Sequence, residues 1–132
     1  MSDEKTYTRQ EFLAIYKISN YQFDGILEFD KFVVSGSEND QKVKWCKNER
    51  LLIISYLSFV NDKWYIHRDK KPALISYYKN GSIKVKWYMF MNKFHREEGP
   101  SVIKYDKLGN VTSTEYWCMG DEQEHLTTKR AL

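Results

Sequence analysis

The sequence predicts a single, mainly β domain: an antiparallel meander of hairpin repeats with a short helix near its N-terminus. Three observations lead to this prediction. Residues of the same type recur at a spacing of 28 positions, apolar and polar side chains alternate along most of the chain, and turn-forming residues interrupt the alternation at short intervals. A period of about 20–50 residues indicates supersecondary units that stack on one another. No βαβ alternation occurs, so a parallel sheet is not expected.

Length and composition fit one domain over residues 1–132. The chain is 42% hydrophobic and 16% aromatic, which is enough to form a sizeable core. Its formal net charge of +3 is too small to indicate a nucleic-acid-binding protein by itself. The first residues do not resemble a secretory signal, no apolar run is long enough to span a membrane, and two cysteines make no disulfide framework. We therefore expect an intracellular protein with reduced thiols.

The first expected element is a short amphipathic helix over residues 9–18. Thr8 and Glu11 match the S/T-x-x-E capping box, with Thr8 as the N-cap residue. The apolar residues that follow have helical rather than alternating spacing; they are Phe12, Leu13, Ile15 and Tyr16. Asn20 and Gly25 mark the end of this helix and the turn after it.

From about residue 26 the periodicity changes to two, which predicts β-strands. Val85 and Trp87, for example, fall on one face of a strand, and Lys84 and Lys86 fall on the other. Asn80-Gly81 between two alternating segments is the strongest hairpin signal in the chain. Strands are expected near residues 26–34, 41–46, 51–59, 63–67, 73–78, 83–90, 101–105 and 111–118.

The repeat is carried by residue types that recur at fixed spacing. His67 and His95, Pro72 and Pro100, Tyr77 and Tyr105, and Gly81 and Gly109 are each 28 residues apart. The spacing becomes 30 residues between Trp87 and Trp117 and between His95 and His125. This change predicts a two-residue insertion between Gly109 and Trp117.

These residues resemble the MORN-repeat variant family, in particular the form with H-R-x-x-G-P-A loops common among proteins of large DNA viruses. The family unit runs Y-Y-x-N-G, a strand, W-Y, a loop, then H-R-x-x-G-P-A and another strand. The matching segments are Tyr77-Tyr78-Lys79-Asn80-Gly81, Trp87-Tyr88 and His95-Arg96-Glu97-Glu98-Gly99-Pro100, with His67-Arg68 and Pro72-Ala73 before them and Tyr105, Gly109, Trp117 and His125 after them. The recognisable repeats cover about residues 59–125. Residues 26–58 could hold a diverged unit, since Lys42-Val43-Lys44-Trp45 echoes Lys84-Val85-Lys86-Trp87.

The chain departs from the family pattern at three positions. Lys71 stands where the loop has Gly, Ser101 where it has Ala, and Leu126 where Arg is expected. The last unit is therefore incomplete, as terminal capping units often are. If the two loops are alike, Lys71 occupies the position of Gly99 and has a positive φ. The resemblance implies a scaffold or protein-interaction module.

The repeated aromatic residues allow two interpretations. Equivalent residues two strands apart should lie roughly 10 Å from each other on one face of the sheet. Trp87 with Trp117, and Tyr77 with Tyr105, could then fill an aromatic core or form an exposed stacking platform. Whether these rings are buried would decide between the two.

The three histidines are not expected to bind a metal ion. Ligands of one zinc ion lie about 2.0–2.1 Å from it, whereas repeat-equivalent histidines are roughly 10 Å apart. We expect each imidazole to bond the backbone of its own loop, and Arg68 and Arg96 to bind loop carbonyls or carboxylates. Structural roles in the repeat are thus expected for His67, Arg68, Pro72, Tyr77, Gly81, Trp87, His95, Arg96, Gly99, Pro100, Tyr105, Gly109, Trp117 and His125.

Catalysis finds no support in the sequence, which has no nucleophile elbow, phosphate loop or dinucleotide fingerprint. We expect neither enzymatic activity nor a cofactor. The expected function is a non-catalytic interaction or scaffold module that binds a protein partner or itself, through an open strand edge near Trp117-Cys118. If the protein is viral, its place would be the host cytoplasm, the nucleus or the virion.

The alternative function is weak nucleic-acid binding. It would use lysines and aromatic rings on one face of the sheet, namely Lys84, Lys86, Tyr88 and Lys104. A net charge of +3 supplies few phosphate contacts, so such binding should fall steeply with salt. The sequence identifies neither the partner nor the oligomeric state.

Overall fold

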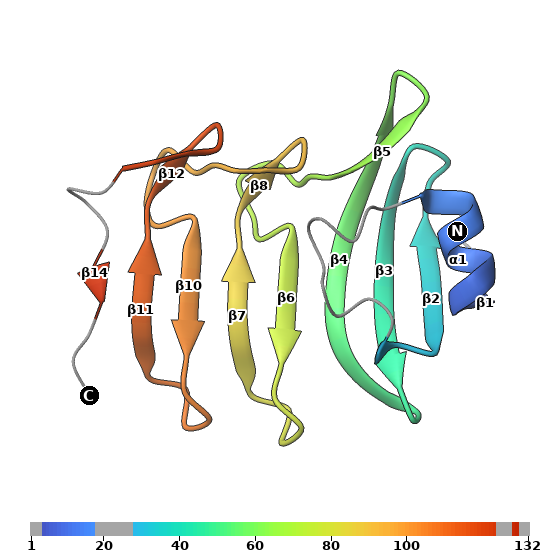
Figure 1. Ribbon diagram of the computed structural model, residues 1–132, viewed down its shortest axis with the longest axis horizontal. Helices are drawn as coiled ribbons and strands as arrows, with labels where there is room; N and C mark the ends of the chain where they lie inside the picture. Colours follow the sequence, from blue (N-terminus) through green and yellow to red (C-terminus); the bar gives the residue numbers. More distant parts are fainter. Residues whose placement is uncertain (1–3, 18–27, 124–127, 130–132) are drawn as a thin grey trace.

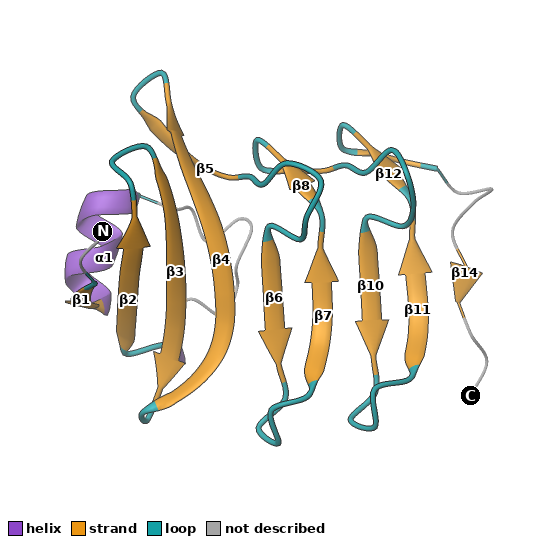
Figure 2. Cartoon of the chain, turned by 180° about the vertical axis from the view of Figure 1, so that it is seen from behind, coloured by secondary structure: helices purple, strands orange, loops and turns teal. Residues whose placement is uncertain are grey.

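The computed structural model describes residues 4–17, 28–123 and 128–129. Within these ranges, ten strands form one antiparallel sheet (Figures 1 and 2). The strands are β1 (Lys5–Thr8), β2 (Lys31–Gly36), β3 (Asp40–Lys47), β4 (Arg50–Val60), β5 (Lys63–Ile66), β6 (Leu74–Tyr77), β7 (Ile83–Trp87), β10 (Val102–Tyr105), β11 (Val111–Glu115) and β14 (Thr128–Lys129). Neighbours in the sheet follow the order of the chain, with β5 paired to the end of β4. The mainly β, antiparallel meander is confirmed.

Two small hairpins stand apart from the sheet, at the same end as the β4–β5 hairpin (Figure 1). They pair β8 (Met89–Phe90) with β9 (Lys93–Phe94), and β12 (Trp117–Cys118) with β13 (Asp121–Glu122). The strands expected near residues 83–90 and 111–118 are therefore each divided, at Tyr88 and Tyr116. In the first case the chain leaves β7 because the Tyr88 N–H bonds the carbonyl of Ser101.

Helix α1 (Arg9–Tyr16) begins where the capping box predicts. The Thr8 hydroxyl accepts from the Glu11 N–H, and the Glu11 carboxylate accepts from the Thr8 N–H. The helix ends earlier than expected because Lys17 takes a left-handed conformation, with φ of 49°, and its N–H bonds the carbonyl of Leu13. Residues 18–27, which include the end of the expected helix and the start of the first expected strand, lie outside the described residues.

Cross-strand pairing defines two faces of the sheet, because directly opposed residues point to the same side. The face that we call the inner face carries Phe32, Trp45, Ser55, Leu74, Val85, Trp87 and Val102. The opposite face, the outer face, carries Lys42, Lys44, Ile54, Tyr56, Ile75, Tyr77, Lys84, Lys86, Ile103 and Tyr105. The fully buried strand residues belong to the inner face, whereas the outer-face residues are exposed or only half-buried.

The densest packing lies where α1 covers the inner face. Phe12 of the helix is fully buried and stacks on Phe32, with ring centroids 4.2 Å apart. Trp45 is also fully buried, and its Nε1 donates to the Ser55 hydroxyl at 2.8 Å. Tyr16 packs against Trp64 of β5, so the helix joins the sheet to the first projecting hairpin.

Backbone hydrogen bonds repeat every 28 residues without interruption. The bond from the Ala73 N–H to the Trp87 carbonyl recurs from Ser101 to Glu115. The bond from the Arg68 N–H to the Met89 carbonyl recurs from Arg96 to Trp117. The predicted two-residue insertion is therefore wrong: Trp87 is equivalent to Glu115, and Trp117 is equivalent to Met89.

The position equivalent to His95 is likewise not His125. The N–H groups of His67, His95 and Gln123 bond the carbonyls of Tyr56, Tyr88 and Tyr116, respectively. Gln123 thus stands where the next histidine was expected, and His125 lies outside the described residues. Tyr56 also places the start of the first unit in β4, slightly before residue 59. The echo at residues 42–45 lies in β3, which runs antiparallel to β7, so it is not an equivalent position.

Candidate interaction surface

The outer face is a continuous surface of aliphatic, tyrosine and lysine side chains. One row crosses the strands in register and contains Lys44, Ile54, Ile75, Lys86, Ile103 and Thr114. Tyr77 and Tyr105, which are 28 residues apart, lie on this face by alternation with Ile75 and Ile103. All of these residues are half-buried, and Figure 2 shows no helix in front of strands β3 to β11.

Lysine side chains approach the tyrosine rings of this face. The Lys86 Nζ lies 5.7 Å from the centre of the Tyr105 ring. The Nζ atoms of Lys84 and Lys107 lie 5.8 and 6.0 Å from the centre of the Tyr78 ring. These distances are within the range of cation–π attraction, which is weak at exposed sites, about 0.5–1 kcal/mol. The ammonium groups are thereby held close to the surface.

Lys104 does not belong to this group. It pairs with Val85, which alternates with Lys84 and Lys86, so its side chain lies on the inner face. There its Nζ lies 3.7 Å from a carboxylate oxygen of Glu115. The expectation that Lys84, Lys86, Tyr88 and Lys104 share one face is therefore wrong for Lys104.

Two arginine–tyrosine stacks border the outer face next to the projecting hairpins. The guanidinium carbons of Arg68 and Arg96 each lie 3.8 Å from the ring centre of Tyr56 and Tyr88, respectively. Each Arg Nη1 also donates to the carbonyl of the proline four residues later, at 3.3 Å for Pro72 and 3.1 Å for Pro100. Binding of loop carbonyls by the arginines is thus confirmed, and the sequence gave no sign of the tyrosine partners.

The loops that hold these arginines differ in backbone conformation. A Cβ added to Gly99, whose φ is +155°, would lie 3.0 Å from the Arg96 guanidinium. In the preceding loop the left-handed residue is Lys70, with φ of 60°, and not Lys71. The expected positive φ of Lys71 is therefore wrong. The loop without glycine shifts its left-handed residue by one position and still places Arg68 on its tyrosine.

The histidines connect consecutive units rather than closing their own loops. His67 Nδ1 accepts from the Met91 N–H at 3.2 Å, and His95 Nδ1 accepts from the Met119 N–H at 3.1 Å. Both donors belong to the turn of the following hairpin, so the expected bond to the histidine's own loop is wrong. Gly81 and Gly109 have φ of 91° and 92° with no atom near their missing side chains, so backbone conformation requires glycine there.

The tryptophans support neither of the two simple interpretations. Trp87 and Trp117 are half-buried and are linked through Phe94, whose ring centre lies 5.2 Å from that of Trp87 and 5.5 Å from that of Trp117. They form a chain of edge contacts beneath the hairpins. The tyrosines of the repeat, in contrast, lie on the outer face.

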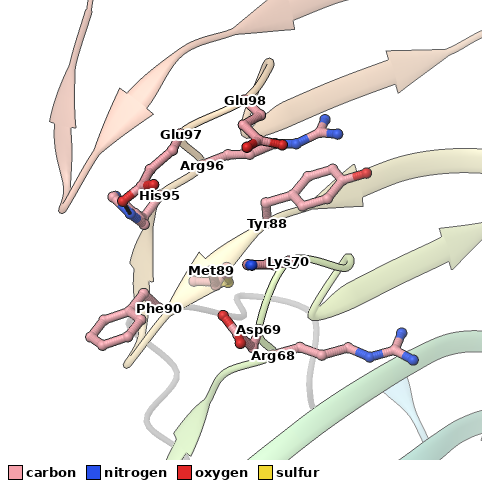
Figure 3. A pocket seen from close by; sticks show the side chains of 10 residues that line it. All are labelled: Arg68, Asp69, Lys70, Tyr88, Met89, Phe90, His95, Arg96, Glu97 and Glu98. Carbon is pink, nitrogen blue, oxygen red and sulfur yellow. Dashed lines mark ion pairs between the residues drawn. The ribbon is translucent and has the colours of Figure 1, made fainter.

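A cleft of about 260 Å³ opens between the loops that follow β5 and β9 (Figure 3). Its charged lining comprises Arg68, Lys70, Arg96, Asp69, Glu97 and Glu98. Basic and acidic groups are equal in number, so charge does not select a ligand. The Phe90 ring, which is 41% exposed, lies beside the cleft with its centre 4.8 Å from that of His67.

Other chemistry is sparse in the part of the chain that the structure describes. No three His, Cys, Asp or Glu side chains come together there to hold a metal ion, and no described helix is long and apolar enough to cross a membrane. Cys46 is buried, which raises the pKa of its thiol, and Cys118 is exposed. The open edge expected at Trp117-Cys118 is occupied, since these residues pair with β13.

Comparison with known proteins adds no relative: no family model, curated protein or solved structure matches this chain.

Proposed function

We propose that the protein is a non-catalytic, repeat-built interaction module and that its outer face binds a macromolecular partner. One observation carries this proposal. A ten-stranded sheet, counted over the described residues, buries its core on one face and leaves isoleucine, tyrosine and lysine side chains on the other. Large exposed surfaces with apolar content typically mark interaction sites.

The repeat makes this surface rigid. Tyr78 Oη donates to the Tyr105 carbonyl at 2.7 Å, and the Ser82 hydroxyl donates to the Lys107 carbonyl at 3.1 Å. Together with the histidine bonds, these contacts fix each unit against the next. A rigid surface loses little conformational entropy on binding, which favours recognition of a partner over a broad area. The resemblance to MORN-repeat variants supports the same class of function.

The titratable groups that would serve catalysis have structural partners here. The imidazoles of His67 and His95 accept backbone N–H groups, and the guanidinium groups of Arg68 and Arg96 are stacked on rings. These contacts support a structural rather than a chemical use of the repeated residues.

Nucleic-acid binding is the second candidate. The proximity of Lys84 and Lys86 to tyrosine rings favours it, because single-stranded binding sites combine cations with aromatic surfaces. The placement of Lys104 on the inner face removes one of the four expected contacts.

Cross-linking in cells, followed by quantitative mass spectrometry, tests the proposal. We compare the wild-type protein with the Ile75→Ser/Lys86→Glu variant of the outer face and with Lys63→Glu, a matched charge reversal on the β4–β5 hairpin. We expect a partner that the wild type and Lys63→Glu capture equally and that the outer-face variant captures at least about tenfold less. Equal capture by all three proteins would contradict the proposal.

Fluorescence anisotropy with a labelled single-stranded oligonucleotide tests the second candidate. At about 150 mM salt we expect micromolar or weaker binding. Submicromolar affinity that withstands salt and is lost in Lys84→Ala/Lys86→Ala would instead establish nucleic acid as the partner.

A further inference from the structure

We infer that the outer face recognises an acidic polypeptide segment with aliphatic side chains, lying across the strands. This inference rests on the proposed function and specifies the chemistry of the partner.

The first argument is the pattern of the central row. Ile54, Ile75 and Ile103 are apolar positions of this row, and Lys44 and Lys86 stand in it at either side of Ile54 and Ile75. From Lys44 to Ile103 the row crosses five strands, or roughly 19 Å at about 4.8 Å per strand. A helix of about 13 residues has this length, at roughly 1.5 Å per residue. A segment with aliphatic and acidic side chains on one side would match both kinds of position.

The second argument is uncompensated positive charge. Residues 31–100 contain fourteen Lys and Arg but only seven Asp and Glu. The structure gives no ion pair to Lys42, Lys84 or Lys86 within the described residues. Lys44 is partnered by Glu4 at 3.7 Å, in an exposed pair that a partner's carboxylate could replace at little cost.

The carboxylates around the face lie at its margins. Asp40, at the start of β3, accepts from the Ser58 hydroxyl, and Glu49 holds Lys31 at 2.8 Å. Asp69, Glu97 and Glu98 belong to the loops beside the projecting hairpins. The centre of the face therefore has a positive potential that complements an acidic partner.

The third argument separates a polypeptide from a nucleic acid. Bases stack on flat rings, but the centre of the row is aliphatic, and isoleucine offers no stacking surface. Tyr56 and Tyr88 each have one ring face covered by the chain's own arginine. Aliphatic side chains of a polypeptide gain from contact with Ile54, Ile75 and Ile103, whereas a phosphate backbone would lose solvation there.

A peptide-display selection tests the inference. The wild-type protein is used to select from random peptides of about 16 residues, long enough to cross the row as a helix. Recovered peptides are then measured by anisotropy against the wild type, Lys44→Glu/Lys86→Glu, Ile75→Ser and the control Lys63→Glu, after each variant is shown to fold by circular dichroism. We expect enrichment of Asp and Glu together with Leu, Ile or Val. Affinity should fall at least about tenfold in the charge-reversed variant, fall in Ile75→Ser, and stay unchanged in Lys63→Glu.

Each contrary result has a distinct meaning. Selected peptides without acidic enrichment, or peptides that bind all variants equally, overturn the inference. Tighter binding of an oligonucleotide at the same residues overturns it in favour of nucleic acid. A homodimer in light scattering that Lys44→Glu/Lys86→Glu dissociates assigns the face to a second copy and also overturns it. If cell partners depend on the outer face while selected peptides are not acidic, the inference fails and the proposed function stands. If cell partners do not depend on that face, the proposed function itself fails.

Discussion

The two ends of the inner face are built in different ways. Under α1, Trp45 is fully buried and its indole nitrogen is bonded to Ser55. Towards the C-terminus, Trp87 is only half-buried, and Lys104 and Glu115 form an ion pair on the same face. The first end is a dry aromatic core, whereas the second resembles one layer of a stack.

This difference teaches where stability comes from in each part. The helix-covered end gains from burial of large rings, which is sensitive to loss of volume. The repeat units gain mainly from backbone bonds and side-chain stacks that recur from unit to unit. The last unit has Asp106, Glu115, Glu122 and Gln123 where the preceding one has Tyr78, Trp87, Phe94 and His95. Such polar replacements are typical of a terminal unit that ends a stack.

The largest expected effect is on the dry core. Trp45→Ala should lower the free energy of unfolding by about 3–5 kcal/mol, because it leaves a cavity and an unpaired Ser55 hydroxyl. Trp87→Ala should cost clearly less, since its ring is half-exposed. Urea unfolding of both variants makes the comparison. Equal losses would mean that the two ends are packed alike.

The second effect concerns the loop glycine. Gly99→Ala should destabilise the protein by about 1–3 kcal/mol, because φ of +155° is unfavourable for alanine and the new methyl meets the Arg96 guanidinium at 3.0 Å. Lys71→Gly, at the equivalent position, relieves no positive φ and should bring no stabilisation. Thermal unfolding measures both, and stabilisation by Lys71→Gly would contradict the loop conformation described above.

A smaller effect is expected at the helix cap. Thr8→Ala should cost about 1 kcal/mol through loss of the bond from the Glu11 N–H. Thr8→Ser, which keeps the hydroxyl, serves as the control and should remain near the wild type in urea unfolding. A cost above that of Trp45→Ala would show that the helix, and not the aromatic core, dominates this end.

The smallest effect is a dependence on alkaline pH. Burial, with a further contribution from Tyr7, raises the pKa of Tyr16 to about 12. In the unfolded chain Tyr16 ionises near its ordinary pKa of about 10, so unfolding releases a proton and stability falls as pH rises from about 10 to 12. The wild type should therefore lose stability more steeply in this window than Tyr16→Phe. Parallel curves would contradict the shift.

Much of the fold could be predicted from local signals. The capping box at Thr8 and Glu11 and the turn at Asn80-Gly81 act within a few residues, so the sequence carries them directly. The 28-residue period also held, although identical tryptophans concealed it. Trp87 and Trp117 are alike in type but not in position, and only backbone bonding reveals that Glu115 is the true equivalent of Trp87.

The composition of the outer face could not be predicted, because it depends on register. A shift of one residue between strands moves every side chain to the other face. Pairing of Lys104 with Val85 therefore removed it from the lysines with which it was grouped. Two-residue strands such as β8 and β12 also lack a measurable period, so the projecting hairpins left no pattern of their own.

The uninterrupted spacing of backbone bonds has a consequence for how such a chain can change by duplication. Removing residues 73–100 would join Pro72 to Ser101, a junction equivalent to the existing one between Pro100 and Ser101. The bond partners on each side of the cut would then meet in the same order as before. Whole units could be gained or lost in this way without altering the reading of register in the rest, so the length of the array is free to vary while its surface chemistry is inherited unit by unit.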